Sequence, residues 1–295
     1  MSVLLTTPKV SEQLSLRHRT LTDRTKQLAK WLARTFPTRT IKLIGDGAYS
    51  VIDLGLGCNK LKHVTLIAPL RLDARLFEPA PVRKPGTNGR PRVVGLRLPL
   101  LRDLATDLNQ KWELSELDWY GGTKREMWLL TGTAVWYSTL WADAPLPLRW
   151  VLVRDPLGKL ETKAFFSTDL AQSAASIASD FVKRWNIEVT FEESRAHLGV
   201  ETQRQWSDLA IERTTPVLLG LFSLVCLFAQ ALQPEGKLEL YQTAWYRKTE
   251  ATFSDVLATV RKSLWGVGFK TSPHTADVCL VSRDLLERLT YAACY

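Results

Sequence analysis

This sequence has no closely spaced cysteines, and its first residues do not contain a long apolar run. The four cysteines lie far apart, with no C-x-x-C pair and no histidine at zinc-ligand spacing: Cys58, Cys226, Cys279 and Cys294. This distribution argues against a disulfide framework and a cysteine-based zinc site, and it predicts reduced, mostly buried thiols in a cytoplasmic protein. The first apolar run, Val3 to Leu5, is too short for the core of a signal peptide.

The sequence also has no apolar run as long as an ordinary membrane span. One stretch, 217–232 (VLLGLFSLVCLFAQAL), has 16 residues, and Ser223 and Gln230 interrupt it. A membrane-spanning helix needs about 20 apolar residues. We therefore expect a helix buried in a large core and no membrane partner. A membrane-associated protein is the alternative, and it depends on this segment alone.

The composition is that of a packed globular protein. Apolar residues make up 45% of the 295 residues, charged residues 23%, and there are 11 tryptophans, which excludes a disordered chain, a collagen-like rod and a coiled coil. The length predicts one large domain with an insertion, or two modest domains. Lys and Arg outnumber Asp and Glu by 39 to 30. This excess favours a polyanionic partner, with nucleic acid first and an acidic membrane surface second.

The first quarter of the chain predicts a strand–helix–strand unit. After a helix over 21–34, IKLI (41–44) is a short buried strand, about 49–56 is a short helix, and HVTLIAP (63–69) is the next strand. Short joints between these elements are typical of a βαβ unit with parallel strands. The fold class is therefore predicted to be α/β.

The character of the sequence changes after this unit, and residues 75–168 predict a β-rich insertion. Its first part, 79–97, is a basic loop without acidic residues that carries Arg83, Lys84, Arg90, Arg92 and Arg97. Short strands rich in Trp and Tyr follow from about 112, and RWVLVRD (149–155) pairs with KAFFSTD (163–169) as a hairpin. Tryptophans on a β layer usually form a core; the alternative is a platform on which unpaired bases stack.

Helical patterns return in the last part of the chain. We expect helices over 171–198, 217–232 and 254–265, followed by a helical tail from 277. The predicted organisation is 1–74 as the first part of a core, 75–168 as the insertion, 169–240 as the second part of the core, and 241–295 as a C-terminal helical region.

Asp46 is the first candidate for a functional residue. It follows the strand 41–44 and has a glycine on each side. Ligand sites of open α/β sheets lie beyond the carboxyl ends of parallel strands. The alternative is an aspartate that only caps a turn or a helix.

The segment FVKRWNIEVTFEESR (181–195) supplies the second set of candidates. Its residues Phe181, Arg184, Glu188, Phe191 and Arg195 are spaced by three or four, so they share one helix face. One interpretation is an exposed row of salt bridges. The other is a metal-binding carboxylate between cations that hold a phosphate.

Together, the two motifs resemble those of DDE transposases from bacterial insertion sequences, in the group with a Y-R-E-K signature. GDGAYS (45–50) resembles the motif of the second catalytic aspartate. Arg184 and Glu188 match the signature at the right offsets, while Phe181 replaces its Tyr and Arg195 its Lys. Glu188 follows Asp46 by 142 positions, and the segment between them holds the β-rich insertion that such proteins carry at this place. The resemblance covers the chain to about residue 235.

The resemblance implies an RNase H-like core, interrupted by the insertion, that cleaves and transfers DNA strands at element ends. Asp46 and Glu188 would be catalytic and would hold Mg²⁺ or Mn²⁺ in a two-metal site, with their carboxylates roughly 4 to 8 Å apart. Arg184 and Arg195 would bind DNA phosphate. The implied partners are transposon-end and target DNA and a second copy of the chain on that DNA, with no small-molecule substrate. The implied location is the bacterial nucleoid.

One expected carboxylate has no match in this sequence. The family has three, and the first ends a strand upstream of the second. We expect Met1–Leu5 to be a later strand of that core, so the chain would lack its N-terminal part and could be inactive alone. Asp155 could instead supply the missing acid, although it heads a turn. The rival functions are a DNA-binding remnant or inhibitor and a non-transposing nuclease on the same core.

Overall fold

A computed structural model places the chain in two compact units, each with its own hydrophobic core. The N-terminal unit contains Thr6–Asn186, and the C-terminal unit contains Ile187–Tyr295. The described residues are 8–83, 86, 88–140, 144–202, 204, 207–233, 238, 240–242, 245, 247–268 and 282–294. The predicted strand Met1–Leu5, Lys84 of the basic loop, Trp141 and Cys279 lie outside them.

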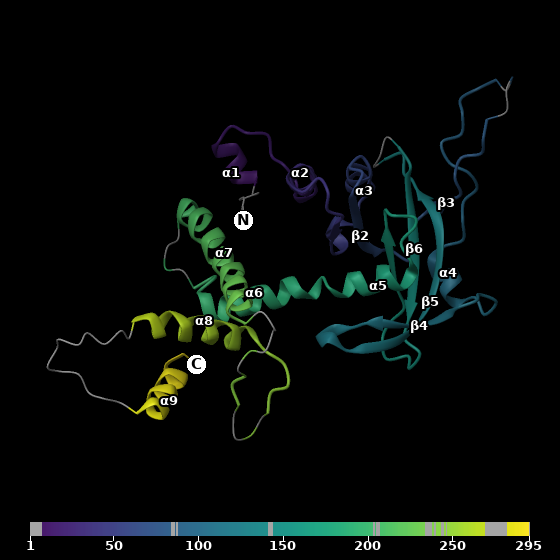
Figure 1. The fold of residues 1–295 in the computed structure, drawn as a ribbon. Helices are drawn as coiled ribbons and strands as arrows, with labels where there is room; N and C mark the ends of the chain where they lie inside the picture. The colour runs from purple at the N-terminus through teal and green to yellow at the C-terminus, as the bar shows by residue number, and fades with distance from the viewer. Residues whose placement is uncertain are drawn as a thin grey trace. The chain divides into compact units, whose positions relative to one another are not determined.

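The N-terminal unit is a mixed α/β structure built on one seven-stranded sheet (Figure 1). Its helices are α1 (Pro8–Gln13), α2 (Leu21–Thr35), α3 (Ile52–Asn59), α4 (Leu101–Thr106) and α5 (Ala174–Val182), with short 3₁₀ helices η1 (Gly47–Tyr49) and η2 (Tyr120–Gly122). Its strands are β1 (Ile41–Ile44), β2 (Val64–Leu70), β3 (Leu76–Phe77), β4 (Glu113–Asp118), β5 (Lys124–Trp136), β6 (Leu146–Arg154) and β7 (Lys163–Ser167). The α/β class predicted from the sequence is confirmed.

The predicted βαβ unit is present at one end of this sheet. β1 and β2 are parallel, with Ile41 opposite Val64 and Ile44 opposite Ile67. The strand order is β1-β2-β7-β6-β5-β3, and β4 pairs with β5. The remaining pairs are antiparallel, so the predicted β-rich insertion extends the sheet that begins with the βαβ unit.

Both faces of the sheet are buried, and helices cover each of them. Neighbouring residues of β6 alternate between two cores: Trp150 and Leu152 face α2 and α3, whereas Val151 and Val153 face α5. This alternation follows from the period of two in a strand. It explains why RWVLVRD is almost wholly apolar, since neither face of its strand meets water.

The C-terminal unit is helical. It contains most of α6 (Trp185–Leu198), then α7 (Asp208–Leu232), α8 (Phe253–Gly268) and α9 (Arg283–Cys294). A small core joins α7 to α8, with Val225 and Ala229 facing Leu257 and Val260, and the ring of Phe222 stacks on that of Phe253 at 4.4 Å. The predicted helix near 254–265 and the helical tail are confirmed where the chain is described.

The prediction that 217–232 forms a helix buried in a large core is wrong. α7 begins nine residues earlier than predicted, at Asp208, because Ser207 caps it by accepting a hydrogen bond from the amide of Ala210. Only Val225 and Ala229 are buried on it, while Val217 is 68% exposed. The physical reason is that one face of α7 packs on α8, and the other apolar residues lie on faces without such a packing contact to the described residues.

Among the described helices, α7 alone is long and apolar enough to cross a membrane. One such helix is weak evidence for a membrane span, because the core helices of soluble proteins pass the same test of length and composition.

The thiols that the structure describes agree with the sequence expectation only in part. Cys58 and Cys226 are free, and Cys58 is fully buried. Burial raises the pKa of the Cys58 thiol to about 11, because the charged thiolate is disfavoured away from water. Cys226 is half-buried in the small core of the C-terminal unit.

Candidate functional site

Asp46 lies where the sequence placed it, just beyond the carboxyl end of a parallel strand. The pairing of β1 with β2 continues for one residue, since the amide of Gly45 donates to the carbonyl of Ile67 at 3.0 Å. A side chain at position 45 would place its Cβ only 2.6 Å from the Cβ of Tyr49, so a glycine is needed there. Asp46 is exposed, and its Oδ1 accepts a hydrogen bond from the amide of Ala48 at 2.8 Å.

The capping role of Asp46 is therefore confirmed, and it leaves Oδ2 without a hydrogen bond to any described residue. An exposed carboxylate with one oxygen fixed by a backbone amide is held in one orientation. Such a group can serve as a ligand for a metal ion or as a simple cap.

The arginine–glutamate motif does not lie on one uninterrupted helix. Lys183 and Arg184 form a turn between α5 and α6. Their amides donate to the carbonyls of Asp180 and Phe181, at 3.1 and 3.0 Å. These bonds span three residues and tighten the helix to about three residues per turn, which shifts the side chains around its axis. The prediction of one helix over 171–198 carrying one straight stripe is wrong at this turn.

Glu188 and Arg195 lie on α6, in the C-terminal unit. The guanidinium of Arg195 makes a two-point ion pair with Glu201, with Nε–Oε2 at 2.7 Å and Nη2–Oε1 at 3.0 Å. A phosphate would have to replace Glu201 to bind this arginine. Asp46 belongs to the N-terminal unit, so a short distance between the carboxylates of Asp46 and Glu188 stays a prediction.

The sequence reasoning missed a buried carboxylate, Asp180. It is 5% exposed and lies in the last turn of α5. Its Oδ2 accepts from Lys42 Nζ at 2.5 Å and from Gln172 Nε2 at 2.8 Å, and its Oδ1 accepts from Lys183 Nζ at 3.0 Å. Burial raises the pKa of Asp180, but the two ammonium groups and their hydrogen bonds outweigh it, so the pKa is lowered.

This cluster connects the strand that precedes Asp46 to the helix that precedes Arg184. Lys42 is two residues before the end of β1, and its side chain is 40% exposed. The sequence contained one signal for it, a lysine in the middle of the otherwise apolar strand IKLI. A charge in such a strand requires a partner when it is partly desolvated.

Asp155 does not replace the missing acid. Its two oxygens accept from the amides of Leu157, Lys159 and Leu160, and it forms an ion pair with Arg125 at 2.9 Å. Burial raises its pKa, and the backbone donors and Arg125 outweigh this, so the pKa is lowered. Asp155 therefore holds the turn between β6 and β7.

The register of the sheet also separates Asp155 from Asp46. Ile44 of β1 is level with Arg149 of β6, and β6 is the third strand from β1 across the sheet. Strands are about 4.8 Å apart and rise about 3.3 Å per residue, which puts the two aspartates roughly 15 to 20 Å apart. Ions of a two-metal site are about 4 Å apart. The alternative in which these two acids share metal ions is wrong.

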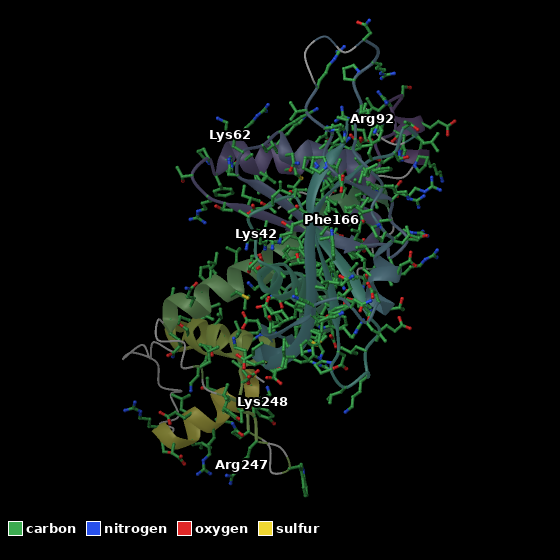
Figure 2. All side chains as sticks on the ribbon, turned by 90° about the vertical axis from the view of Figure 1, so that its right-hand side faces the viewer. Lys42, Lys62, Arg92, Phe166, Arg247 and Lys248 are labelled. Carbon is green, nitrogen blue, oxygen red and sulfur yellow. The ribbon has the colours of Figure 1, made fainter. Side chains whose placement is uncertain are left out.

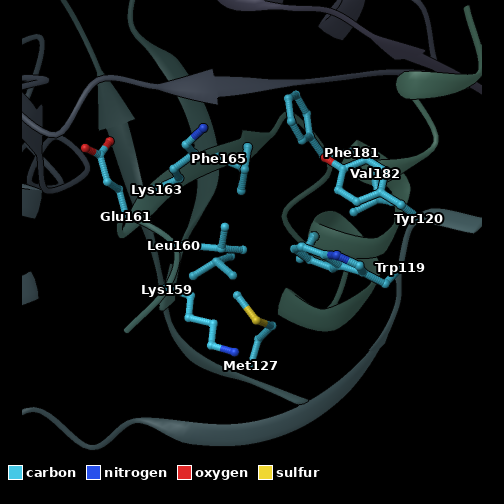
Figure 3. Close-up of a pocket in the computed structure, with 12 residues that line it drawn as sticks. Trp119, Tyr120, Met127, Lys159, Leu160, Glu161, Lys163, Phe165, Phe181 and Val182 are labelled. Atoms are coloured by element: carbon cyan, nitrogen blue, oxygen red, sulfur yellow. The ribbon is translucent and has the colours of Figure 1, made fainter. Parts of the chain in front are cut away.

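The aromatic residues of the insertion divide between a core and a pocket. Trp150 is buried, and Trp112 and Trp136 pack against the same core, as expected for a β layer. Other aromatic side chains line a pocket of about 390 Å³ between α5 and the sheet (Figure 3). Its apolar floor and aromatic walls come from Met127, Val153, Phe165, Trp119, Tyr120 and Phe181.

The charged residues at this pocket favour an anionic occupant. Lys159 and Lys163 line it, and neither forms an ion pair with a described residue. The carboxylate of Glu161 points away from its centre (Figure 3). The guanidinium of Arg184 lies 5.9 Å from the ring centroid of Phe181. An aromatic surface beside cations suits a planar group attached to a phosphate.

A complete metal site is not formed by the part of the chain that the structure describes. No group of three or more His, Cys, Asp or Glu side chains in that part could hold a metal ion. The N-terminal unit therefore supplies Asp46 as a single carboxylate, and this does not fit a two-metal site by itself.

The comparisons with known proteins assign no family to this chain. A scan against protein-family models found no match, and neither did a search of curated proteins.

Proposed function

We propose that the chain is a DNA phosphodiester-transfer protein of the insertion-sequence transposase type, with an RNase H-like core. The observation that carries the proposal is the position of Asp46, directly after the first strand of a parallel βαβ unit. The motif of Arg184, Glu188 and Arg195 follows after a β-rich segment, as in the proteins that the two motifs resemble. The proposed partners are DNA and a second copy of the chain, in the bacterial cytoplasm.

The residues divide the proposed chemistry between them. Asp46 and Glu188 would hold Mg²⁺ or Mn²⁺, which when bound activates the attacking oxygen and stabilises the leaving oxygen. Arg184 would bind a DNA phosphate beside the aromatic pocket, which accommodates a base next to that phosphate. Arg195 would bind a second phosphate after releasing Glu201.

A DNA-binding protein without catalysis is the second candidate. The observation that favours it is the absence of three grouped metal ligands from the described part of the chain. Both candidates bind DNA, and they differ in whether the carboxylates act.

A cleavage assay with Asp46→Asn and Glu188→Gln separates the two candidates. The purified chain is incubated with supercoiled or end-bearing DNA and Mg²⁺ or Mn²⁺. If the two carboxylates act as proposed, either substitution should reduce metal-dependent cleavage by at least about 100-fold, because each removes a charged metal ligand. Asparagine still caps a helix, so Asp46→Asn keeps the local fold.

Two matched controls accompany these variants. Asp169 is exposed and caps the amide of Ala171 at 2.9 Å, as Asp46 caps that of Ala48, so Asp169→Asn controls for Asp46→Asn. Glu192→Gln changes an exposed acid one turn after Glu188 on the same helix. Cleavage that survives both site substitutions contradicts the assignment. DNA binding without any cleavage supports the second candidate.

A further inference from the structure

The segment around α2 carries a large net positive charge. Residues 15–43 contain eight Lys and Arg residues against one acid, Asp23, a surplus of seven, whereas the whole chain has a surplus of nine. The eight are Arg17, Arg19, Arg24, Lys26, Lys30, Arg34, Arg39 and Lys42. This concentration was not apparent from the basic loop at 79–97, which is a separate feature.

The packing of α2 decides which of these charges face water. Ala29 and Ala33 are 1% and 8% exposed and form the inner face of the helix. Lys30 and Arg34 follow these alanines by one position, about 100° around the helix, and both are exposed. Trp31, which is 58% exposed, lies on the side of the helix opposite the two alanines.

Few of the outward-facing cations are neutralised within the protein. Lys26 contacts Asp53 at 2.6 Å and Asp23 at 3.3 Å, and Lys42 is held by Asp180. In contrast, the remaining exposed cations of this region form no ion pair with any described residue: Arg17, Arg19, Lys30, Arg34 and Arg39. Their charge is available to a partner.

The same surface continues onto the end of α3. This helix packs against α2, and Lys60 and Lys62 follow it as exposed residues without an ion pair to a described residue. Figure 2 shows Lys62 at the outside of the molecule, beside α2. We name the set Arg17, Arg19, Lys30, Arg34, Arg39, Lys60 and Lys62 the α2 basic surface.

We propose that the α2 basic surface binds the phosphate backbone of duplex DNA without regard to base sequence. The proposal rests on the DNA partner of the proposed function and adds a surface to which no motif pointed. Lys30 and Arg34 are one turn, about 6 Å, apart and can contact phosphates of one strand together. Trp31 lies beside these two residues around the helix and supplies an apolar face for a sugar.

An anionic membrane is the rival partner for such a surface, and the apolar residues of α2 disfavour it. A membrane-surface helix presents a continuous apolar face opposite its basic face. The exposed apolar residues of α2 are Leu21, Leu28 and Trp31, and around the helix Arg24 lies between Leu28 and Trp31. The exposed apolar residues therefore do not form one continuous face.

The test is the salt dependence of duplex binding, measured by fluorescence anisotropy with the full chain and an arbitrary duplex of about 30 base pairs. Each phosphate contact adds about 0.9 to the slope of log affinity against log salt. We expect Lys30→Gln with Arg34→Gln to lower this slope by about 2 and to weaken binding about tenfold at low salt. Glutamine is a good helix former, so α2 should remain folded.

A control pair removes the same charge elsewhere in the unit. Arg75 and Lys111 are exposed and lie in the segments before β3 and β4. If Arg75→Gln with Lys111→Gln lowers the slope as much, net charge alone explains binding and the proposal is wrong. Binding to phosphatidylserine vesicles without binding to the duplex would equally overturn it.

The same assay distinguishes this proposal from the catalytic one. Asp46→Asn and Glu188→Gln should leave the salt slope unchanged while they abolish cleavage. If the chain does not cleave DNA but the Lys30 and Arg34 substitutions lower its salt slope, the binding surface is supported and the proposed catalysis is wrong. If the chain cleaves DNA and the Lys30 and Arg34 variant has an unchanged salt slope, the proposed surface is wrong and the proposed catalysis stands.

Discussion

The two units of this protein differ in charge, in architecture and in how well they bury their apolar residues. Residues 6–186 contain 28 Lys and Arg against 17 Asp and Glu, a net +11, whereas residues 187–295 contain 11 against 13, a net −2. The N-terminal unit covers both faces of a sheet, while the C-terminal unit has one small core between helices. The positive surplus of the chain therefore lies in the N-terminal unit, whereas Glu188 and Arg195 of the proposed site belong to the other unit.

Each unit contains a buried, fully paired aspartate, and its removal should have the largest effect on stability. Asp255 is fully buried and accepts from Lys248 Nζ at 2.9 Å and from the amides of Thr252 and Tyr241. We expect Asp255→Ala and Asp180→Ala each to cost about 3 kcal/mol, because buried donors lose their acceptor. Urea denaturation measures this loss.

Hydrogen exchange then shows whether the two units respond separately. Exchange should increase in β1 and α5 for Asp180→Ala, and in α8 for Asp255→Ala. Asp169→Ala, at an exposed cap, is the control and should change little. Faster exchange throughout the chain in either variant would show that the two units unfold together as one cooperative unit.

A packing change limited to the sheet should have the next largest effect. Gly132 of β5 lies against Trp150 of β6, and a Cβ at position 132 would meet the indole ring at 2.8 Å. We expect Gly132→Ala to destabilise the N-terminal unit by about 2 kcal/mol, since the ring of Trp150 must move within a packed core. Gly220→Ala on α7, where nothing lies within 4 Å, should not destabilise the C-terminal unit.

Acid should weaken both units in the same direction. The pKa values of Asp180 and Asp255 are lowered by their cationic and backbone partners, even though burial opposes ionisation. A carboxyl whose pKa is lower in the folded state stabilises the fold above its unfolded pKa, near 3.9, and loses this contribution as the pH falls through the folded value. Urea midpoints at neutral pH and near pH 3 measure the effect, and Asp180→Asn should reduce it. A midpoint that rises on acidification would contradict this reasoning.

The smallest expected effect concerns Arg195. Glu201→Gln removes its exposed partner, and such pairs are worth up to about 1 kcal/mol. If Arg195 binds phosphate, duplex affinity should rise by no more than about fivefold in this variant. Glu192→Gln on the same helix is the charge-matched control. Equal affinity in the two variants would remove Arg195 from the proposed phosphate site.

The sequence predicted the elements whose pattern is local. IKLI was assigned as a strand with the bounds that the structure has, because four residues between turn signals can form little else. The parallel pairing of β1 with β2 followed from the short joints around α3. The position of Asp46 after β1 followed in turn from that pairing.

The sequence-based predictions were wrong where one sequence pattern is compatible with two different structures. Spacings of three and four continue through Lys183 and Arg184, so they could not reveal the 3₁₀ turn there. Composition showed that 217–232 is apolar, but it could not show how little of α7 would be covered. The role of Asp180 depends on Lys42, a contact between residues 138 positions apart that no local spacing encodes.

The end of the sheet at β1 has a consequence for the behaviour of the protein in a crowded solution. A terminal strand exposes unpaired amides and carbonyls, and long, flat, apolar strands of this kind template aggregation. β1 has four residues, and Lys42 places a charge in the middle of it. Among the described strands β1 is the last at this end of the sheet. A short charged strand gives an approaching chain few backbone groups to pair with, so its edge does not favour cross-β assembly.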